Sequence, residues 1–289
     1  MRCFLLASCL GLTQSVAAWV AAPRKIASRV SLSASTVPSL TGSQLDELRS
    51  NQYIILQDFI PPPLQSSLRS DIQNLRQASK FNIAKIGEGA TNALNDNIRV
   101  AETCFLGPGK LNDVPSTARQ NLYDIIDQVR GDLERSSGQA LDGRLTELLY
   151  AYYPQGGFYR RHRDALPGST SNLRRFSFLL YLNEDWDAEK DGGCLRMHMD
   201  GGGDVLPEGA TPNFRDISPD GGTLVVFASD AIPHEVLDTR KERMAVVGWF
   251  NRPVSMDDLT DLSGGGVNPV MLGVAAALVT VGLVNLIAG

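Results

Sequence analysis

Hydrophobic residues in the first half of the chain recur at helical spacing. The stretch 64–79 places apolar residues three or four positions apart, and the stretch 116–136 does the same with a serine able to cap its start. A shorter helix is expected over 44–52, with Thr41 or Ser43 as its cap. These segments predict helices that each bury one face.

The second half of the chain has a different pattern of apolar and polar residues. Short apolar runs alternate with clusters of Gly, Pro and Asp, which is typical of strands joined by turns. The predicted strands cover 146–154, 174–183, 192–199, 221–228 and 242–251. An earlier strand is expected over 53–60, and the polar segment 81–97 predicts a mobile loop. Short strands that follow helices predict an α+β, mainly β fold, a β-sandwich or small barrel with helices on one side.

Composition narrows the possible functions. The 289 residues carry a formal net charge of −5 with a pI near 5.3, which argues against nucleic acid as the main partner. Only Cys104 and Cys194 lie outside the N-terminal segment, without a CxxC motif or a Cys/His cluster. We therefore expect two partly buried free thiols and no zinc site.

Both ends of the chain have the composition of targeting or membrane segments. Residues 1–18 combine a basic start, an apolar stretch and a small-residue cleavage site, which predicts a signal peptide. Residues 19–43 are transit-like, rich in Ser and Ala with few acidic residues, or simply disordered. Together they predict entry into the secretory pathway, with an endomembrane or a complex plastid as the destination.

The C-terminal residues 269–289 carry no charge and are long enough to span a bilayer as a helix. We expect a transmembrane anchor, joined to the core by an acidic and Gly-rich linker over 254–268. The alternative is a terminal helix buried in the protein or docked on a subunit. The anchor would make the membrane a partner of the chain.

The chemistry centres on a His-x-Asp motif and a later histidine. His162 and Asp164 are two residues apart, so we expect one strand to deliver both to the same face, and His234 follows after a β-rich stretch. Two imidazoles and one carboxylate on one face of a metal form the ligand set of non-haem Fe(II) oxygenases. Arg243, nine residues after His234, could clamp the carboxylate of a co-substrate, with Tyr181 donating its hydroxyl to the same group. The combined spacing is far more specific than the His-x-Asp motif alone.

The residues around these positions resemble the HIF-type prolyl hydroxylases, within the 2-oxoglutarate- and Fe(II)-dependent prolyl 4-hydroxylase group. The resemblance is dense over 150–251 and fainter back to about residue 53. The segments that carry it are YLNEDWDAEKDGGCLR (181–196), Tyr153-Pro154, HRD (162–164), PHEV (233–236) and WF (249–250). It leaves out both ends of the chain and divides the rest into a support region, 44–145, and an oxygenase core, 146–253.

The resemblance implies a double-stranded β-helix, or jelly roll, with iron at one mouth. It implies roles for nine residues. The iron ligands would be His162, Asp164 and His234, the 2-oxoglutarate contacts Arg243 and Tyr181, the pocket walls Tyr153 and Leu195, and the substrate contacts Arg174 and Arg99. The loop 81–97 would cover the substrate, and the insertion 200–213 is longer than the turn of the family. Because this loop and this insertion differ from those of the family, the resemblance does not identify the substrate.

The implied activity is hydroxylation of a peptidyl proline in a protein or peptide. It would consume O2 and 2-oxoglutarate, release succinate and CO2, and use ascorbate as family members often do. Two alternatives remain: an oxygenase of the same fold that acts on a small molecule or another side chain, and a non-catalytic binding or sensing module at a membrane. The complete ligand set and Arg243 favour an enzyme.

Other residues whose side chains could take part in chemistry are expected to have structural roles instead. His198 is expected at the surface and not as a ligand. Trp186 and Trp249 are expected to pack in the sheet, and Asp185 and Asp187 to form a turn.

Overall fold

The computed structural model describes residues 37–86, 93–107, 109–199, 211–255 and 258. The predicted signal peptide and the predicted anchor 269–289 lie outside the described residues, as do most of the linker and of the insertion 200–213. Within the described part of the chain, no helix is both long and apolar enough to cross a membrane.

The elements follow one another as short helices and strands. The helices are α1 (Gly42–Asn51), α2 (Pro62–Gln77), α3 (Thr117–Ser137), α4 (Ala188–Asp191) and a 3₁₀ turn, η2 (Thr170–Leu173). The strands are β1 (Tyr53–Leu56), β2 (Asn82–Ile83), β3 (Arg99–Val100), β4 (Glu102–Phe105), β5 (Leu148–Tyr153), β6 (Phe158–His162), β7 (Arg174–Tyr181), β8 (Leu195–His198), β9 (Phe214–Ile217), β10 (Leu224–Ala228), β11 (His234–Val236) and β12 (Arg243–Asn251).

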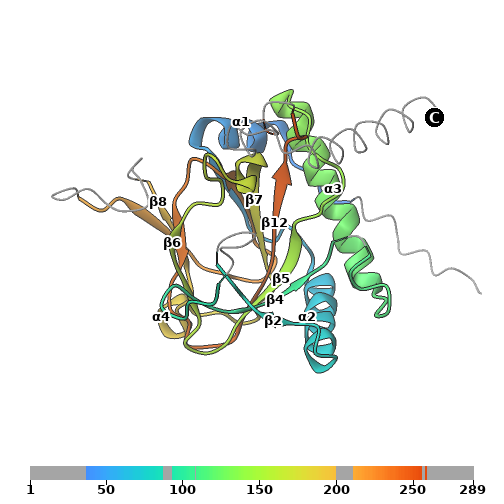
Figure 1. Ribbon diagram of the computed structural model, residues 1–289, viewed down its shortest axis with the longest axis vertical. Helices are drawn as coiled ribbons and strands as arrows, with labels where there is room; N and C mark the ends of the chain where they lie inside the picture. Colours follow the sequence, from blue (N-terminus) through green and yellow to red (C-terminus); the bar gives the residue numbers. More distant parts are fainter. Residues whose placement is uncertain (1–36, 87–92, 108, 200–210, 256–257, 259–289) are drawn as a thin grey trace, which may run out of the picture. The chain divides into compact units, whose positions relative to one another are not determined.

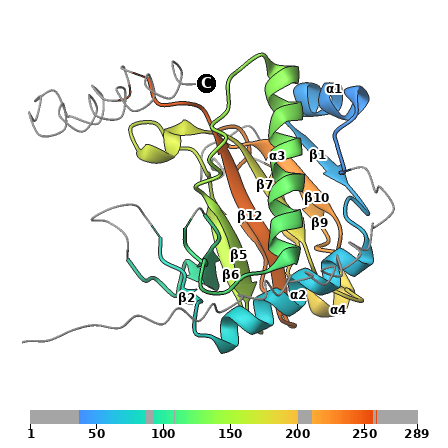
Figure 2. The same ribbon diagram turned by 90° about the vertical axis from the view of Figure 1, so that its right-hand side faces the viewer.

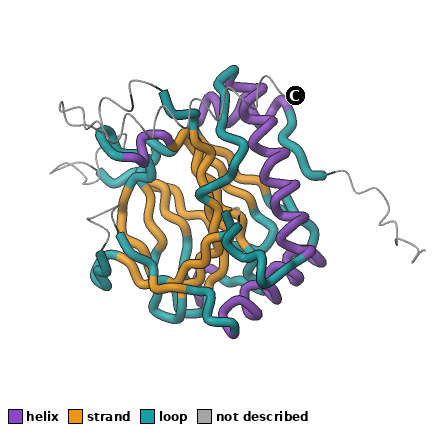
Figure 3. The backbone as a smooth tube through the Cα atoms, turned by 45° about the vertical axis from the view of Figure 1, so that its right-hand side comes forward, coloured by secondary structure: helices purple, strands orange, loops and turns teal. Residues whose placement is uncertain are grey.

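Among the described residues these strands form two antiparallel sheets. The larger has the order β1-β10-β7-β12-β5-β4-β2, and the smaller has the order β3-β6-β11-β8-β9. Figure 1 shows the strands of the two sheets facing one another, with α2 and α3 on the far side of the larger sheet. The tube in Figure 3 shows the same division, with the longer helices on one side of the strands. The predicted jelly-roll architecture is confirmed.

The alternation of side chains along β7 explains the layers. Phe178 and Leu180 belong to the core between the larger sheet and the helices. Leu179 and Tyr181 point the other way, into the core between the two sheets. Successive strand residues point to opposite faces, so both faces of this strand must be apolar.

The helices begin and end where the sequence provides caps. Thr41 caps α1 in a capping box with Gln44, and the Ser116 side chain accepts a hydrogen bond from the Arg119 backbone at the start of α3. Gly138, at φ 67°, ends α3 in the left-handed conformation that glycine adopts without strain. Figure 2 shows α3 and α2 lying across the strands of the larger sheet.

Two predicted segments differ from the structure. β1 ends at Leu56, four residues early, because the chain turns at Asp58 (φ 50°) and the Phe59 amide then bonds to the Gly222 carbonyl. The segment 81–97 holds the paired strand β2, so the prediction of a loop throughout is wrong; residues 87–92 lie outside the described part.

A buried ion pair joins α2 to α3, and a tyrosine of the larger sheet bonds to its carboxylate. The Asp71 carboxylate on α2 accepts hydrogen bonds from Arg119 Nε and Nη2 at 2.9 and 3.1 Å, and from the Tyr150 hydroxyl at 2.9 Å. Both charged side chains are at most 6% exposed. Both charges have lost their hydration on folding, and the attraction between them offsets that desolvation cost.

We therefore expect Asp71→Ala to lower the free energy of unfolding by about 3–5 kcal/mol, because it leaves Arg119 as an uncompensated buried cation. Urea unfolding measures the change. The matched control is Asp46→Ala, which breaks the exposed Arg49–Asp46 pair and should cost less than about 1 kcal/mol. Equal losses in the two variants would contradict the prediction.

Candidate active site

Two histidines and one aspartate meet between β6 and β11. His162 ends β6, His234 begins β11, and the two are direct partners in the antiparallel register. Asp164 Oδ1 lies 3.5 Å from His162 Nε2, and Asp164 Oδ2 lies 3.5 Å from His234 Nε2. Ligand atoms of all three residues lie within 4.8 Å of one another, close enough to hold one metal ion.

Asp164 reaches this cluster from a loop. β6 ends at His162, so the expectation that one strand carries both residues is not met. The chain is held after Asp164 by the Ala165 amide, which donates to the Ser229 carbonyl at 3.2 Å. The carboxylate is buried, at 7% exposure for the residue.

Both imidazoles are oriented by backbone carbonyls. Nδ1 of His162 lies 2.8 Å from the Arg160 carbonyl, and Nδ1 of His234 lies 3.0 Å from the Ile232 carbonyl. A carbonyl can only accept, so Nδ1 carries the proton and Nε2 keeps its lone pair toward Asp164. Tyr159 stacks on the His162 ring with centroids 3.7 Å apart, which restricts its rotation.

The electrostatics favour the protonation states that metal binding requires. Burial lowers the pKa of His234 to about 4, against the opposing attraction of Asp164. Burial alone would raise the pKa of Asp164, but its interactions with His234, His162 and Arg174 lower it below its usual range. At neutral pH the site therefore offers a neutral imidazole at His234 and an ionised carboxylate.

A second polar cluster lies near the triad, around Arg243. This residue begins β12 and is fully buried, and its Nε donates to the Gly193 carbonyl at 2.9 Å. Nη1 and Nη2 of Arg243 and the Tyr181 hydroxyl have no hydrogen-bond partner among the described residues. Gly193 adopts φ 66°, and a Cβ there would lie 3.2 Å from Cδ of the arginine, so glycine lets this side chain lie close.

An unpaired buried guanidinium requires an anion. A carboxylate would satisfy both free Nη groups in the bidentate geometry that arginine favours. Burial raises the pKa of Tyr181 well above its usual range, although the charge of Arg243 opposes the shift, so the hydroxyl stays a donor. The residues present therefore fit a small dicarboxylate, one carboxylate of which Arg243 and Tyr181 would hold, beside a triad that could hold a metal.

A cavity of about 700 Å³ opens beside the triad. Its lining brings together most of the predicted site residues: His162, Asp164, His234, Tyr153, Leu195, Arg174 and Arg99. Arg243 and Tyr181 lie beyond this lining, where the Arg243 guanidinium is 5.1 Å from the Tyr153 ring and 5.0 Å from the Tyr181 ring. All nine predicted residues therefore lie in or beside one site.

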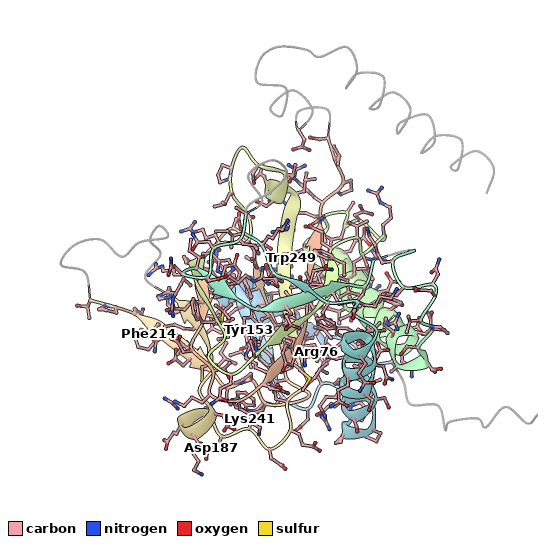
Figure 4. All side chains as sticks on the ribbon, turned by 60° about the horizontal axis from the view of Figure 1, so that its bottom comes forward. Arg76, Tyr153, Asp187, Phe214, Lys241 and Trp249 are labelled. Atoms are coloured by element: carbon pink, nitrogen blue, oxygen red, sulfur yellow. The ribbon has the colours of Figure 1, made fainter. Side chains whose placement is uncertain are left out.

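Some cavity residues were not predicted. Trp249 was expected only to pack, but it lines the cavity and its buried indole N–H has no partner among the described residues. Figure 4 shows Trp249 and Tyr153 in the middle of the domain, whereas Phe214 lies at the outer end of β9. Glu147 also lines the cavity. Only the alternation along β5 and β12 could have indicated these two from sequence.

His198 takes no part in the cluster, as expected, but it is not a plain surface residue. It is half-buried, with Nε2 3.1 Å from Glu235 Oε1 and Nδ1 3.1 Å from Arg161 Nη1.

Cys104 is buried and Cys194 half-buried, both as free thiols.

A jelly roll with a His-Asp-His cluster beside a buried arginine defines a metal-dependent oxygenase that takes a carboxylate co-substrate. Residues 148–251 match the family model described as the 2OG-Fe(II) oxygenase superfamily. The chain belongs to this superfamily.

Its relatives include prolyl hydroxylases. Egl nine homolog 1 of Homo sapiens is 26% identical over 197 residues, which cover 68% of this chain and 43% of that protein. The chain spans about half the length of the curated relatives it matches. A solved prolyl-4-hydroxylase of Pseudomonas putida is 30% identical, with a TM-score of 0.58 over 73% of this chain and 98% of that one.

A third comparison supports the fold alone. The prolyl hydroxylase of Trichoplax adhaerens, solved with a peptide fragment of the hypoxia inducible factor oxygen degradation domain, is 23% identical. Its TM-score is 0.59 over 78% of this chain and 91% of that one.

Proposed function

We propose that this chain is a 2-oxoglutarate- and Fe(II)-dependent dioxygenase that hydroxylates proline in a protein or peptide. The observation that carries the proposal is the buried Arg243, whose two Nη groups have no partner in the described part of the chain, next to a His-Asp-His cluster. In this assignment His162, Asp164 and His234 hold the iron. Arg243 and Tyr181 hold the distal carboxylate of 2-oxoglutarate.

When bound, the iron and 2-oxoglutarate supply the chemistry: one atom of O2 enters the substrate, the other enters succinate, and CO2 is released. The chain's own residues position these reactants. Arg243 and Tyr181 fix one end of the dicarboxylate so that its other end faces the triad. Tyr153 and Leu195, both buried, wall the pocket and exclude water. Ascorbate, as a reductant that keeps the iron ferrous, is part of the proposal.

The character of the cavity mouth supports a peptide as substrate. Ile83, Phe105 and Leu166 line the cavity and yet remain 61%, 49% and 43% exposed. Exposed apolar side chains around a cavity are typical of surfaces that bind another molecule. Arg99 lines the same cavity, with its guanidinium 4.5 Å from the centre of the Tyr159 ring and its buried Nε without a hydrogen-bond partner among the described residues. A small molecule would leave this apolar rim uncovered.

Proline is proposed because of the similarity to prolyl hydroxylases. We expect the purified full chain, supplied with Fe(II), 2-oxoglutarate, ascorbate and O2, to add one oxygen atom to proline-containing peptides. Mass spectrometry of a peptide library measures the product. Matched peptides with alanine in place of proline are the control and should remain unmodified.

The outcomes separate the alternatives. Succinate formed without any peptide product would favour a small-molecule substrate or another side chain. Peptide binding without succinate formation, in protein that binds iron, would favour a non-catalytic binding module.

A further inference from the structure

Three neighbouring strands end in a polar network at one side of the cavity. Arg174 begins β7, Asn251 ends β12, and Glu147 immediately precedes β5. Arg174 Nε and Nη2 both donate to the Glu147 carboxylate, the former at 3.2 Å, and Asn251 Nδ2 donates to the same carboxylate at 2.9 Å. The carboxylate is therefore held from two sides.

The remaining edge of the guanidinium points toward the triad. Arg174 Nη1 donates to the Asp164 backbone carbonyl at 3.0 Å. The flat face of the guanidinium lies 4.1 Å from the Trp249 ring, which leaves the group little freedom to rotate. Since Asp164 lies in a loop, this bond ties the position of its backbone to the larger sheet.

The charges agree with this geometry. Burial would raise the pKa of Glu147, but hydrogen bonds from Arg174 and Asn251 lower it below its usual value, so the residue stays ionised. Arg174 therefore joins the Glu147 carboxylate to the backbone carbonyl of Asp164. Without Glu147, the guanidinium would lose the partner that holds two of its three nitrogens and could turn into the cavity.

We propose that Glu147 is a positioning residue for the metal centre: it holds Arg174 so that the guanidinium anchors the loop carrying Asp164. The proposal rests on the assignment of the triad as the metal site. It does not depend on the identity of the substrate. Neighbours that orient ligands in this way commonly contribute 10- to 100-fold, in rough terms, to metal affinity.

The experiment titrates Co(II), as a spectroscopic stand-in for Fe(II), into the metal-free full chain and follows the visible absorption of the bound ion. We expect Glu147→Ala to raise the Co(II) dissociation constant about 10- to 100-fold. Glu147→Gln keeps the shape but loses the charge, and should raise it less. Circular dichroism confirms that each variant is folded.

The matched control is Asp216→Asn. Arg196 donates to Asp216 through Nε at 2.7 Å and Nη2 at 2.8 Å, a pair of similar geometry and similar partial exposure on the smaller sheet. Loss of this pair should leave the Co(II) dissociation constant within about twofold of wild type, because the hydrogen bonds of the Arg196 guanidinium go to Asp216 and not to the loop that carries Asp164.

A double-mutant cycle tests whether Glu147 affects Co(II) affinity through Arg174. If Glu147 acts through Arg174, the double variant Glu147→Ala with Arg174→Ala should bind Co(II) no more weakly than Arg174→Ala alone. Additive losses would overturn the proposal, as would an unchanged dissociation constant in folded Glu147→Ala. If that variant does not fold, an unchanged constant in Glu147→Gln overturns it instead.

The two proposals fail in different ways. A wild-type chain that binds Co(II) but modifies no peptide would remove the proline assignment and leave the role of Glu147 standing. A wild-type chain that binds no Co(II) would remove the metal site and this proposal with it.

Discussion

Asp164→Ala should abolish Fe(II) binding at micromolar concentrations, with a loss of affinity above about 100-fold, which exceeds the loss typical of residues that only orient a ligand. Asp164 is the anionic member of the cluster, and its low pKa keeps it ionised across the working pH range. Without it, two neutral imidazoles would have to hold the cation alone. Anaerobic titration with Fe(II) and 2-oxoglutarate, followed by the absorption band of their complex, measures the change.

The matched control for this experiment is His198→Ala. His198 is a half-buried histidine on the same sheet as the two cluster histidines, but its ring bonds to Glu235 and Arg161. We expect its loss to leave the Fe(II) dissociation constant within about threefold of wild type. Retained Fe(II) affinity in folded Asp164→Ala would show that the metal binds at another site.

Arg243→Met should weaken the binding of 2-oxoglutarate without lowering the stability of the folded protein. The variant loses two charge-assisted hydrogen bonds to the distal carboxylate, each worth about 1.5–3 kcal/mol, so 2-oxoglutarate should bind at least about 100-fold more weakly. In the absence of 2-oxoglutarate, the same change removes a buried cation with two unsatisfied nitrogens. We therefore expect unfolding in urea to show the variant to be at least as stable as wild type.

Tyr181→Phe provides a graded comparison. It removes one neutral donor from the same cluster, so the affinity for 2-oxoglutarate should fall by only about three- to tenfold. Wild-type affinity in Arg243→Met would place the co-substrate at another site. A loss of stability in the metal-free variant would show that Arg243 has a structural role in the core.

Several features of the fold could be predicted because their causes are local. The caps of α1 and α3 lie within four residues of the amides they satisfy. The nearly continuous apolar runs in β7 and β12 report burial on both faces. The strands that carry the cluster were harder to identify, because β6 (FYRRH) and β11 (HEV) are short and polar. Their pairing with neighbouring strands, and not their own propensity, makes them strands.

The amino-acid sequence was sufficient to indicate which residue types could bind a metal and a carboxylate, since His162, Asp164, His234 and Arg243 stand at a specific spacing. The folded structure was needed to show that Asp164 enters from a loop, and that the buried Nη groups of Arg243 have no partner among the described residues. It also brought Glu147 to Arg174 and Trp249 to the cavity wall. Burial and ion pairing depend on strands that are neighbours in the sheet but more than twenty residues apart in the chain, and no local pattern records that proximity.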